Sequence, residues 1–171
     1  MEERKGLVTF KGQPLVLVGN EVRVGYKMPD CELVDKDLKA VKLSSFKGKI
    51  CIISSVPSLD TPVCDIMTRK FSKEVTSLSK DVVMLAVSMD LPFAQARWCG
   101  AADVKNVHTL SDHREALFGQ AFGVLIKDLR LLARAVFVVD KNGIIRYIEL
   151  VKEIASEPNY DAALKAAKEL V

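Results

Sequence analysis

A strand signal followed closely by a helix start is the feature that most restricts how this 171-residue chain can fold. Residues 50–56, ICIISSV, form a run rich in β-branched side chains, which is typical of a central strand buried on both faces. Just after it, Thr61 suits the N-cap of a helix and Pro62 suits the first helical position. Apolar residues then recur at steps of three or four as far as Leu78, which predicts an amphipathic helix.

Similar local patterns predict the remaining elements. Strands are expected at residues 8–10, 15–18, 31–34, 40–43, 82–88, 107–110, 135–139 and 144–150. Helices are expected at residues 93–99, with Gly100 closing the helix, at 115–122 and at 160–170. Buried strands that alternate with helices imply a central mixed sheet with helices on both faces, preceded here by an N-terminal β-hairpin. We therefore expect an α/β protein with a thioredoxin-like fold and one domain spanning residues 1–171.

Composition and charge exclude several classes of function. Apolar residues make up 49% of the chain and charged residues 27%, which is ordinary for a globular protein. The net charge is only +3 and no basic block occurs, so we expect no nucleic-acid partner. The acidic N-terminus does not resemble a secretory signal, and apolar runs such as residues 82–87 are too short to span a bilayer. We therefore expect a cytoplasmic protein with no membrane association.

The four cysteines, Cys31, Cys51, Cys64 and Cys99, leave two interpretations open. Two structural disulfides fit poorly, because the chain is long enough to fold without them and shows no export signal. The two histidines have no cysteine or carboxylate at metal-ligand spacing, so we expect no metal site. In a reducing compartment the cysteines are therefore either inert core residues or redox catalysts. We interpret Cys51, inside the predicted central strand, and Cys31 as structural.

Cys64 is the third residue of the helix predicted to start at Pro62. The exposed backbone N–H groups of a first turn and the positive end of the helix macrodipole favour an anion there. A thiol in that position ionises more readily than a free one, and the thiolate is the nucleophilic form. Asp65 opposes this charge, so a cation must come from elsewhere in the chain. The alternative is that Cys64 is a buried, inert cysteine.

The segment around Cys64 resembles the active-site loop of the peroxiredoxins. Members of that family share the pattern Pro-x-x-x-Thr-x-x-Cys, which Pro57, Thr61 and Cys64 fill at the right spacing. Together with residues 96–100, ARWCG, and 131–135, LLARA, the segment is similar to the bacterial thiol peroxidase subfamily, an atypical two-cysteine type. The resemblance extends over nearly the whole chain, although the C-x-x-C motif of thioredoxin itself is missing.

The resemblance implies a set of roles around the nucleophile. Cys64 is expected to be the peroxidatic cysteine, with Thr61 and the backbone near Val63 donating toward the peroxide oxygens. Pro57 is expected to shape the loop and shield the thiolate from water. Arg134 is expected to be the missing cation, held close to the sulfur. The alternative for Arg134 is a residue at a strand end whose charged head reaches water.

The resemblance also implies a catalytic cycle. Cys99 is expected to be the resolving cysteine, which condenses with the Cys64 sulfenate to form an intramolecular Cys64–Cys99 disulfide. Both cysteines are predicted on helices, so we expect local unwinding before they meet. The alternative for Cys99 is a buried helix residue without a redox role.

The function that follows is a thioredoxin-dependent peroxidase, active in antioxidant defence, that reduces hydrogen peroxide and organic hydroperoxides. It needs no cofactor, because sulfur carries the redox chemistry, and related proteins commonly form homodimers. A redox-sensing protein that passes oxidation to a partner is the alternative from another class. A thioredoxin-like disulfide reductase is weakened by the missing C-x-x-C motif.

Overall fold

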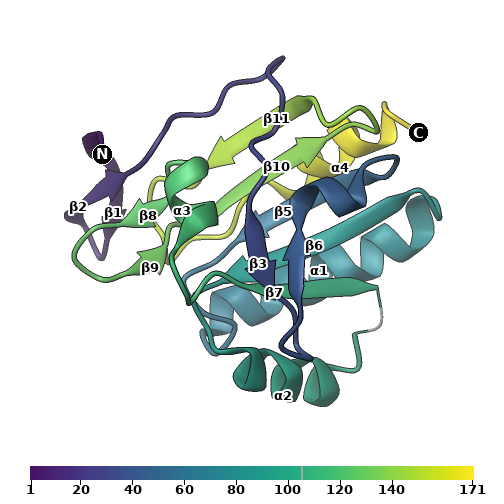
Figure 1. The fold of residues 1–171 in the computed structure, drawn as a ribbon, viewed down its shortest axis with the longest axis horizontal. Coiled ribbons are helices and arrows are strands. Elements are labelled where there is room, and N and C mark those ends of the chain that lie inside the picture. Colours follow the sequence, from purple (N-terminus) through teal and green to yellow (C-terminus); the bar gives the residue numbers. More distant parts are fainter. Residues whose placement is uncertain (105) are drawn as a thin grey trace.

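A seven-stranded mixed sheet forms the centre of the structure, a computed structural model that describes residues 1–104 and 106–171. The strands lie in the order β11 (Ile145–Leu150), β10 (Ala135–Val139), β5 (Ile50–Ser55), β6 (Val82–Ser88), β7 (Val107–Ser111), β3 (Glu32–Val34) and β4 (Ala40–Lys42). Strands β5, β6 and β7 are parallel, whereas β10 runs antiparallel to β5. The predicted central strand is therefore confirmed as an inner strand of the sheet, between β10 and β6 (Figure 1).

A second, smaller sheet contains the N-terminal hairpin. Its order is β1 (Glu3–Phe10), β2 (Gln13–Val18), β8 (Leu125–Ile126) and β9 (Leu131–Leu132). The hairpin was expected, but the two-residue strands β8 and β9 were not, because so short a segment carries no periodic pattern. Pairing of β2 with β8 attaches the hairpin to the segment that leads into β10.

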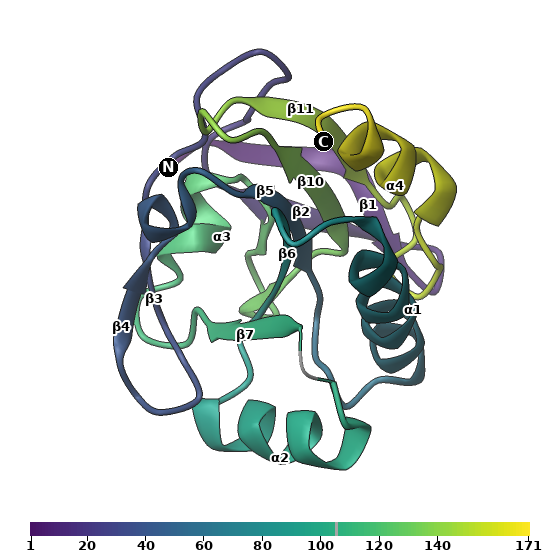
Figure 2. The ribbon, with the colours of Figure 1, turned by 90° about the vertical axis from the view of Figure 1, so that its right-hand side faces the viewer.

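Helices cover the central sheet on opposite faces. The structure contains α1 (Pro62–Leu78), α2 (Pro92–Ala102), α3 (Leu117–Ala121), α4 (Tyr160–Lys168) and a short 3-10 helix, η1 (Leu43–Phe46). Figure 2 shows α1 and α4 together on one side of the sheet and α3 on the other, with α2 beyond β7. None of the described helices combines the length and apolarity that crossing a lipid bilayer requires.

Alternation along β5 explains why both of its faces are buried. Ile50 and Ile52 belong to the apolar cluster beneath α1 and α4. Cys51 and Ile53 point the other way, into the cluster that contains the hairpin and α3. A strand with apolar residues on both faces needs helices or strands on both sides, which this arrangement supplies.

Several predicted boundaries differ from the structure. The strand expected at residues 8–10 begins at Glu3, and the helix expected at 115–122 is limited to Leu117–Ala121. The predicted end of α2 is also wrong. The helix expected to close at Gly100 continues to Ala102 and ends at Asp103, which has a left-handed φ of 51°. Gly100 lies on an exposed helix face and takes no positive φ, while the two alanines that follow favour helix. Asp is among the few residues that enter the left-handed region readily, so Asp103 terminates the helix instead.

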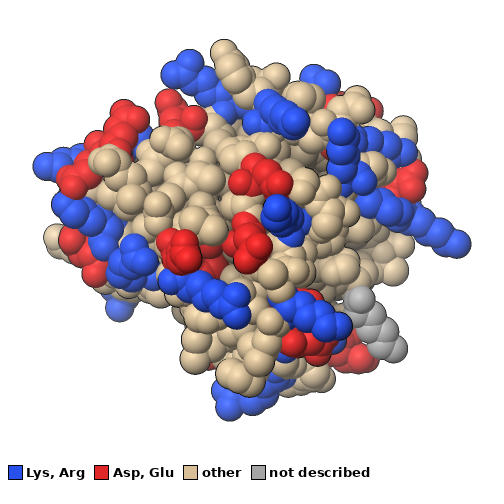
Figure 3. Space-filling view, viewed as in Figure 1, with Lys and Arg blue, Asp and Glu red and all other residues tan. Residues whose placement is uncertain are grey.

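Acidic and basic side chains are interspersed over the face of the molecule seen in Figure 3, with a wide uncharged area between them. This mixture agrees with the small net charge of +3.

Candidate active site

The start of α1 places Cys64 in contact with Arg134, although 70 positions separate them in the chain. Cys64 lies in the first turn of α1, and Arg134 immediately precedes β10. The Nη2 atom of Arg134 donates to the Sγ atom of Cys64 at 3.2 Å. Cys64 is 0% exposed and Arg134 is 1% exposed, so the alternative of an arginine head reaching water is excluded.

Two further hydrogen bonds determine the orientation of the Arg134 guanidinium. Its Nε atom donates to the carbonyl oxygen of Ile154 at 2.8 Å, and its Nη1 atom donates to the Sδ atom of Met67 at 3.4 Å. Met67 lies on the same helical face as Cys64, because it follows three residues later. The planar guanidinium is therefore directed at two sulfur atoms of α1 and at one backbone carbonyl.

Asp65 follows Cys64 in the sequence, and two side chains donate hydrogen bonds to its carboxylate. The Nε atom of Arg69 donates to both Asp65 oxygens at 3.0 Å, and Trp98 Nε1 donates to Oδ1 at 2.7 Å. Arg69 itself is exposed on the helix surface. Through Asp65, these contacts also join α1 to α2 close to Cys64.

Thr61 caps α1 as predicted. Its backbone is extended, with φ −87° and ψ 145°, and its Oγ1 atom accepts a hydrogen bond from the backbone N–H of Cys64 at 3.4 Å. The same hydroxyl donates to the carbonyl of Ser58 at 3.1 Å. In this structure the hydroxyl hydrogen is therefore used within the loop, whereas Thr61 was expected to donate toward the peroxide oxygens.

Asp90 holds the loop between β5 and α1, a role that we did not predict from the sequence. Its carboxylate accepts hydrogen bonds from Ser58 Oγ at 2.6 Å and from Leu59 N at 2.8 Å. Ser88 Oγ donates to the same carboxylate at 2.7 Å. An acidic residue just after β6 was a usable signal, because the carboxyl ends of parallel strands meet at one edge of a sheet.

The other two residues predicted to form the substrate pocket lie on either side of the thiol in sequence. Pro57 follows β5 and is buried, and Val63 is the half-buried second residue of α1. Because Cys64 itself is 0% exposed, a hydroperoxide can reach its sulfur only when this loop or the first turn moves.

Cys99 has a different environment. It is half-buried in α2, and its Sγ atom lies 3.6 Å from Thr109 Oγ1. It also lines a cavity of about 530 Å³ between β7 and the turn that joins β3 to β4. Cys64 and Cys99 are both free thiols, and both pack into or against the same apolar cluster. The structure thus describes the reduced form of the predicted pair.

The remaining cysteines, Cys31 and Cys51, are buried, and neither accepts a hydrogen bond from a lysine or arginine among the residues that the structure describes. Burial raises the pKa of Cys51 to about 12. The pKa of Cys31 is also raised to about 12, by burial and by the nearby carboxylates of Asp112 and Asp30. A thiol with so high a pKa is almost entirely protonated at neutral pH and is a poor nucleophile.

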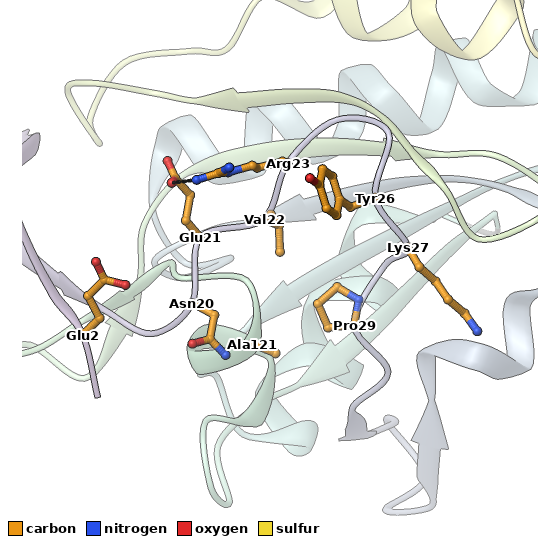
Figure 4. A pocket seen from close by; sticks show the side chains of 9 residues that line it. All are labelled: Glu2, Asn20, Glu21, Val22, Arg23, Tyr26, Lys27, Pro29 and Ala121. Atoms are coloured by element: carbon orange, nitrogen blue, oxygen red, sulfur yellow. Dashed lines mark ion pairs between the residues drawn. The ribbon is translucent and has the colours of Figure 1, made fainter.

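A polar pocket of about 570 Å³ lies apart from the thiols. Its lining residues are Glu2, Asn20, Glu21, Val22, Arg23, Tyr26, Lys27, Pro29 and Ala121 (Figure 4). They come from the loop after β2, from α3 and from the N-terminal residues, and none belongs to α1 or α2. Its own charges include the Glu21–Arg23 ion pair at 3.7 Å.

Comparison with known proteins gives this geometry a family context. The Redoxin family model matches residues 23–164 of the chain. A thiol peroxidase from Bacillus subtilis (strain 168) is 54% identical over 164 residues, which cover 96% of this chain and 98% of that protein. A thiol peroxidase from Listeria innocua serovar 6a is 53% identical over 161 residues, covering 94% of this chain and 97% of that one.

Solved structures agree with the fold. A peroxiredoxin-like protein from Aquifex aeolicus has a TM-score of 0.90 at 43% identity, covering 98% of this chain and 99% of that one. A thiol peroxidase from Chromobacterium violaceum has a TM-score of 0.86 at 23% identity and covers 95% of each chain, which shows the fold alone. Fold and site together define a peroxiredoxin-type oxidoreductase with a thioredoxin fold. The chain belongs to the Redoxin family and, within it, to the thiol peroxidases.

Proposed function

We propose that this protein reduces hydrogen peroxide and organic hydroperoxides with the Cys64 thiolate as nucleophile. The observation that supports this most directly is the 3.2 Å contact between Arg134 Nη2 and Cys64 Sγ, both buried, at the start of a capped helix. A buried cation next to a buried thiol favours the ionised sulfur, because each charge compensates the desolvation of the other.

The first step is an attack of the thiolate on one peroxide oxygen. A sulfur–oxygen bond forms, the oxygen–oxygen bond breaks, and the departing oxygen leaves as alkoxide or hydroxide and takes up a proton. Cys64 is oxidised to the sulfenic acid and the peroxide is reduced to an alcohol or water. Arg134 donates to the sulfur before the attack and to the developing oxygen charge during it.

The second step joins the Cys64 sulfenic acid to the Cys99 thiol, which forms a disulfide and releases water. A disulfide requires Cα atoms within about 7 Å of each other. Because Cys64 and Cys99 both lie in helices, α1 and α2, we propose that local unwinding precedes the bond. A dithiol reductant, which we propose to be thioredoxin, then reduces the disulfide and regenerates both thiols.

We further propose that the protein is a cytoplasmic homodimer. Ile66, Leu91 and Phe93 are 51%, 54% and 68% exposed, and they lie at the starts of α1 and α2. Exposed apolar side chains favour association between copies of a chain. Four free cysteines suit a reducing compartment.

A coupled assay tests the proposal. Reduced protein is mixed with tert-butyl hydroperoxide or hydrogen peroxide in the presence of thioredoxin, thioredoxin reductase and NADPH. Continuous NADPH oxidation by the wild type, none by Cys64→Ser, and a single turnover by Cys99→Ser are the expected results. Consumption of one equivalent by the wild type without recycling would instead identify a redox sensor.

A further inference from the structure

The segment after β11, residues 151–156, holds the Arg134 side chain and is itself held by the N-terminal hairpin. The carbonyl of Ile154 accepts the Nε hydrogen bond of Arg134 at 2.8 Å, and Val151 N donates to the Arg134 carbonyl at 3.0 Å. On the opposite side, Thr9 N donates to Lys152 O at 2.7 Å, and Ile154 N donates to Thr9 O at 3.0 Å. Thr9 and Glu153 form a parallel bridge, so β1 runs alongside this segment (Figure 2).

The carboxylate of Glu153 accepts hydrogen bonds from four donors at the junction between the N-terminal hairpin and residues 151–156. It accepts hydrogen bonds from Thr9 Oγ1 at 2.8 Å, Lys11 N at 3.0 Å, Gly12 N at 3.1 Å and Ala155 N at 3.2 Å. The amides of Lys11 and Gly12 converge because both residues of this turn take a positive φ, 50° and 78°. One side chain therefore clamps the hairpin turn to residues 153–155, more than 140 positions away in the chain.

The orientation of the guanidinium depends on this junction. Among the described residues, the Ile154 carbonyl is the one oxygen to which the Arg134 guanidinium donates, and its other two acceptors are sulfur atoms. The Met67 thioether is a weaker acceptor than this carbonyl, and the Cys64 sulfur changes its bonds during the reaction, so the carbonyl is the partner that stays fixed. When that carbonyl shifts, the Nη2 atom of Arg134 loses its alignment with Cys64.

We propose that Glu153 is a positioning residue for the peroxide step, acting through Ile154 and Arg134 on the reactivity of Cys64. It touches no reacting atom. Its carboxylate binds the hairpin turn to the segment whose carbonyl orients the arginine. This inference rests on the proposed function, because it takes Cys64 as the nucleophile.

The test uses Glu153→Gln, which keeps the side-chain shape but turns an amide NH₂ toward backbone donors. We expect the single-turnover reaction of reduced protein with hydrogen peroxide to slow about three- to tenfold at pH 7. Its pH profile should move to higher pH, while the rate of the subsequent disulfide formation stays unchanged. Glu115→Gln is the matched control, because the structure assigns no hydrogen bond to that exposed carboxylate among the described residues, and it should match the wild type.

A double-mutant cycle separates positioning from general stability. In an Arg134→Ala background, Glu153→Gln should cause no further slowing, because its effect passes through the arginine. Equal slowing in both backgrounds, or an unmoved pH profile, overturns the proposal. If Glu153→Gln does not fold, Thr9→Val removes one bond to the same carboxylate and should produce a smaller effect in the same direction. A wild-type rate in folded Thr9→Val would then overturn the proposal.

A measurement without peroxide distinguishes this inference from the proposed function. Side-chain NMR of ¹⁵N-labelled arginine should show the Arg134 Nε–H exchanging with solvent faster in Glu153→Gln than in the wild type. An unchanged exchange rate would overturn the proposal that Glu153 holds the Arg134 side chain in position. A wild-type protein that consumes no hydroperoxide overturns the proposed function, and the exchange result still decides whether Glu153 holds the arginine.

Discussion

Cys51 lies in β5 and Cys64 lies in α1, the helix that follows this strand, and the two are almost equally buried, at 2% and 0% exposure, yet their environments differ in kind. Cys51 faces the apolar cluster under the hairpin, and its Sγ atom donates to Lys49 O at 3.8 Å. Cys64 receives a hydrogen bond from a buried guanidinium at the N-terminus of a helix. Burial alone protonates a thiol, whereas burial together with a fixed cation favours a nucleophile.

Substitution of Cys64, the proposed nucleophile, should show the largest functional difference between Cys64 and Cys51. Cys64→Ser should lower steady-state peroxide consumption by at least about 10⁴-fold, since a serine hydroxyl does not replace the thiolate. Cys51→Ala should keep turnover within about twofold and lose about 1 kcal/mol of stability through a small cavity. NADPH-coupled turnover and thermal unfolding measure the two effects. A large loss of turnover in Cys51→Ala would contradict the interpretation of Cys51 as an inert core thiol.

Alkylation measures the protonation of the inert thiols directly. In a Cys64→Ser/Cys99→Ser variant, only Cys31 and Cys51 remain, and burial raises the pKa of each to about 12. At pH 9 the folded protein should therefore react with iodoacetamide roughly 10³-fold more slowly than the urea-unfolded chain. Mass spectrometry of timed samples gives both rates. Rapid labelling of the folded variant would contradict the inert assignment.

Loss of the guanidinium should make Cys64 resemble Cys51. Arg134→Ala should slow the reaction with hydroperoxide by about 10²-fold and move its pH profile upward, because the sulfur loses its cation. Arg134→Lys should recover only part of the rate, since an ammonium group cannot reach Cys64, Met67 and Ile154 at the same time. Stopped-flow measurement across pH tests this, and a wild-type profile in Arg134→Ala would exclude the arginine from the chemistry.

Local elements of the fold could be predicted from the sequence, whereas the tertiary contacts that orient Arg134 could not. The strand at residues 82–88 and the cap at Thr61 follow local patterns and have the predicted bounds in the structure. Cys64 was identified by its place in the first turn of the predicted helix, whereas its peroxidatic role and the role of Arg134 came from the resemblance. The Ile154 carbonyl was not identified, because any residue supplies a carbonyl and only tertiary packing selects one.

The end of one helix, the contacts of one loop and two short strands also depended on tertiary structure and were not predicted from local sequence patterns. The end of α2 depended on whether Gly100 or Asp103 took the left-handed conformation, and the residue type favoured the wrong one. The Asp90 contacts with the Ser58 loop join segments about 30 positions apart, and no local pattern reports them. Strands β8 and β9 form only because β2 provides an edge to pair with.

A smaller effect should distinguish Cys99, whose helix is proposed to unwind during the cycle, from Cys51, which stays in its strand. The Trp98 Nε1 hydrogen bond to Asp65 joins α2 to α1, so Trp98→Phe should release α2 more easily. Formation of the Cys64–Cys99 disulfide after one equivalent of peroxide should accelerate about fivefold, which corresponds to about 1 kcal/mol. Quenched-flow mass spectrometry measures this rate. Arg97→Gln, on an exposed position of the same helix, is the control, and equal rates in Trp98→Phe and the wild type would rule out the restraint.

The smallest effect concerns acid stability at the hairpin junction. Hydrogen bonds from Gly12 N and Thr9, with those from Lys11 N and Ala155 N, lower the pKa of Glu153 from 4.5 to about 2. Because the pKa is depressed in the folded state, this stabilisation is complete above about pH 4.5 and is lost as the pH falls toward 2. The Tm of the wild type should therefore fall more between pH 5 and pH 3 than that of Glu153→Gln. Calorimetry measures both, and parallel decreases would contradict the assignment.

Trp98 is the single tryptophan of the chain, so the tryptophan fluorescence of the protein comes from this one side chain. Its indole N–H donates to the Asp65 carboxylate, and the Arg69 guanidinium lies 5.8 Å from its ring centroid, so two charges surround the chromophore. Any displacement of α2 changes both neighbours at once and with them the intensity and wavelength of the emitted light. The intrinsic fluorescence of the unlabelled protein therefore reports on the helix that carries Cys99, and the redox cycle can be followed optically in real time.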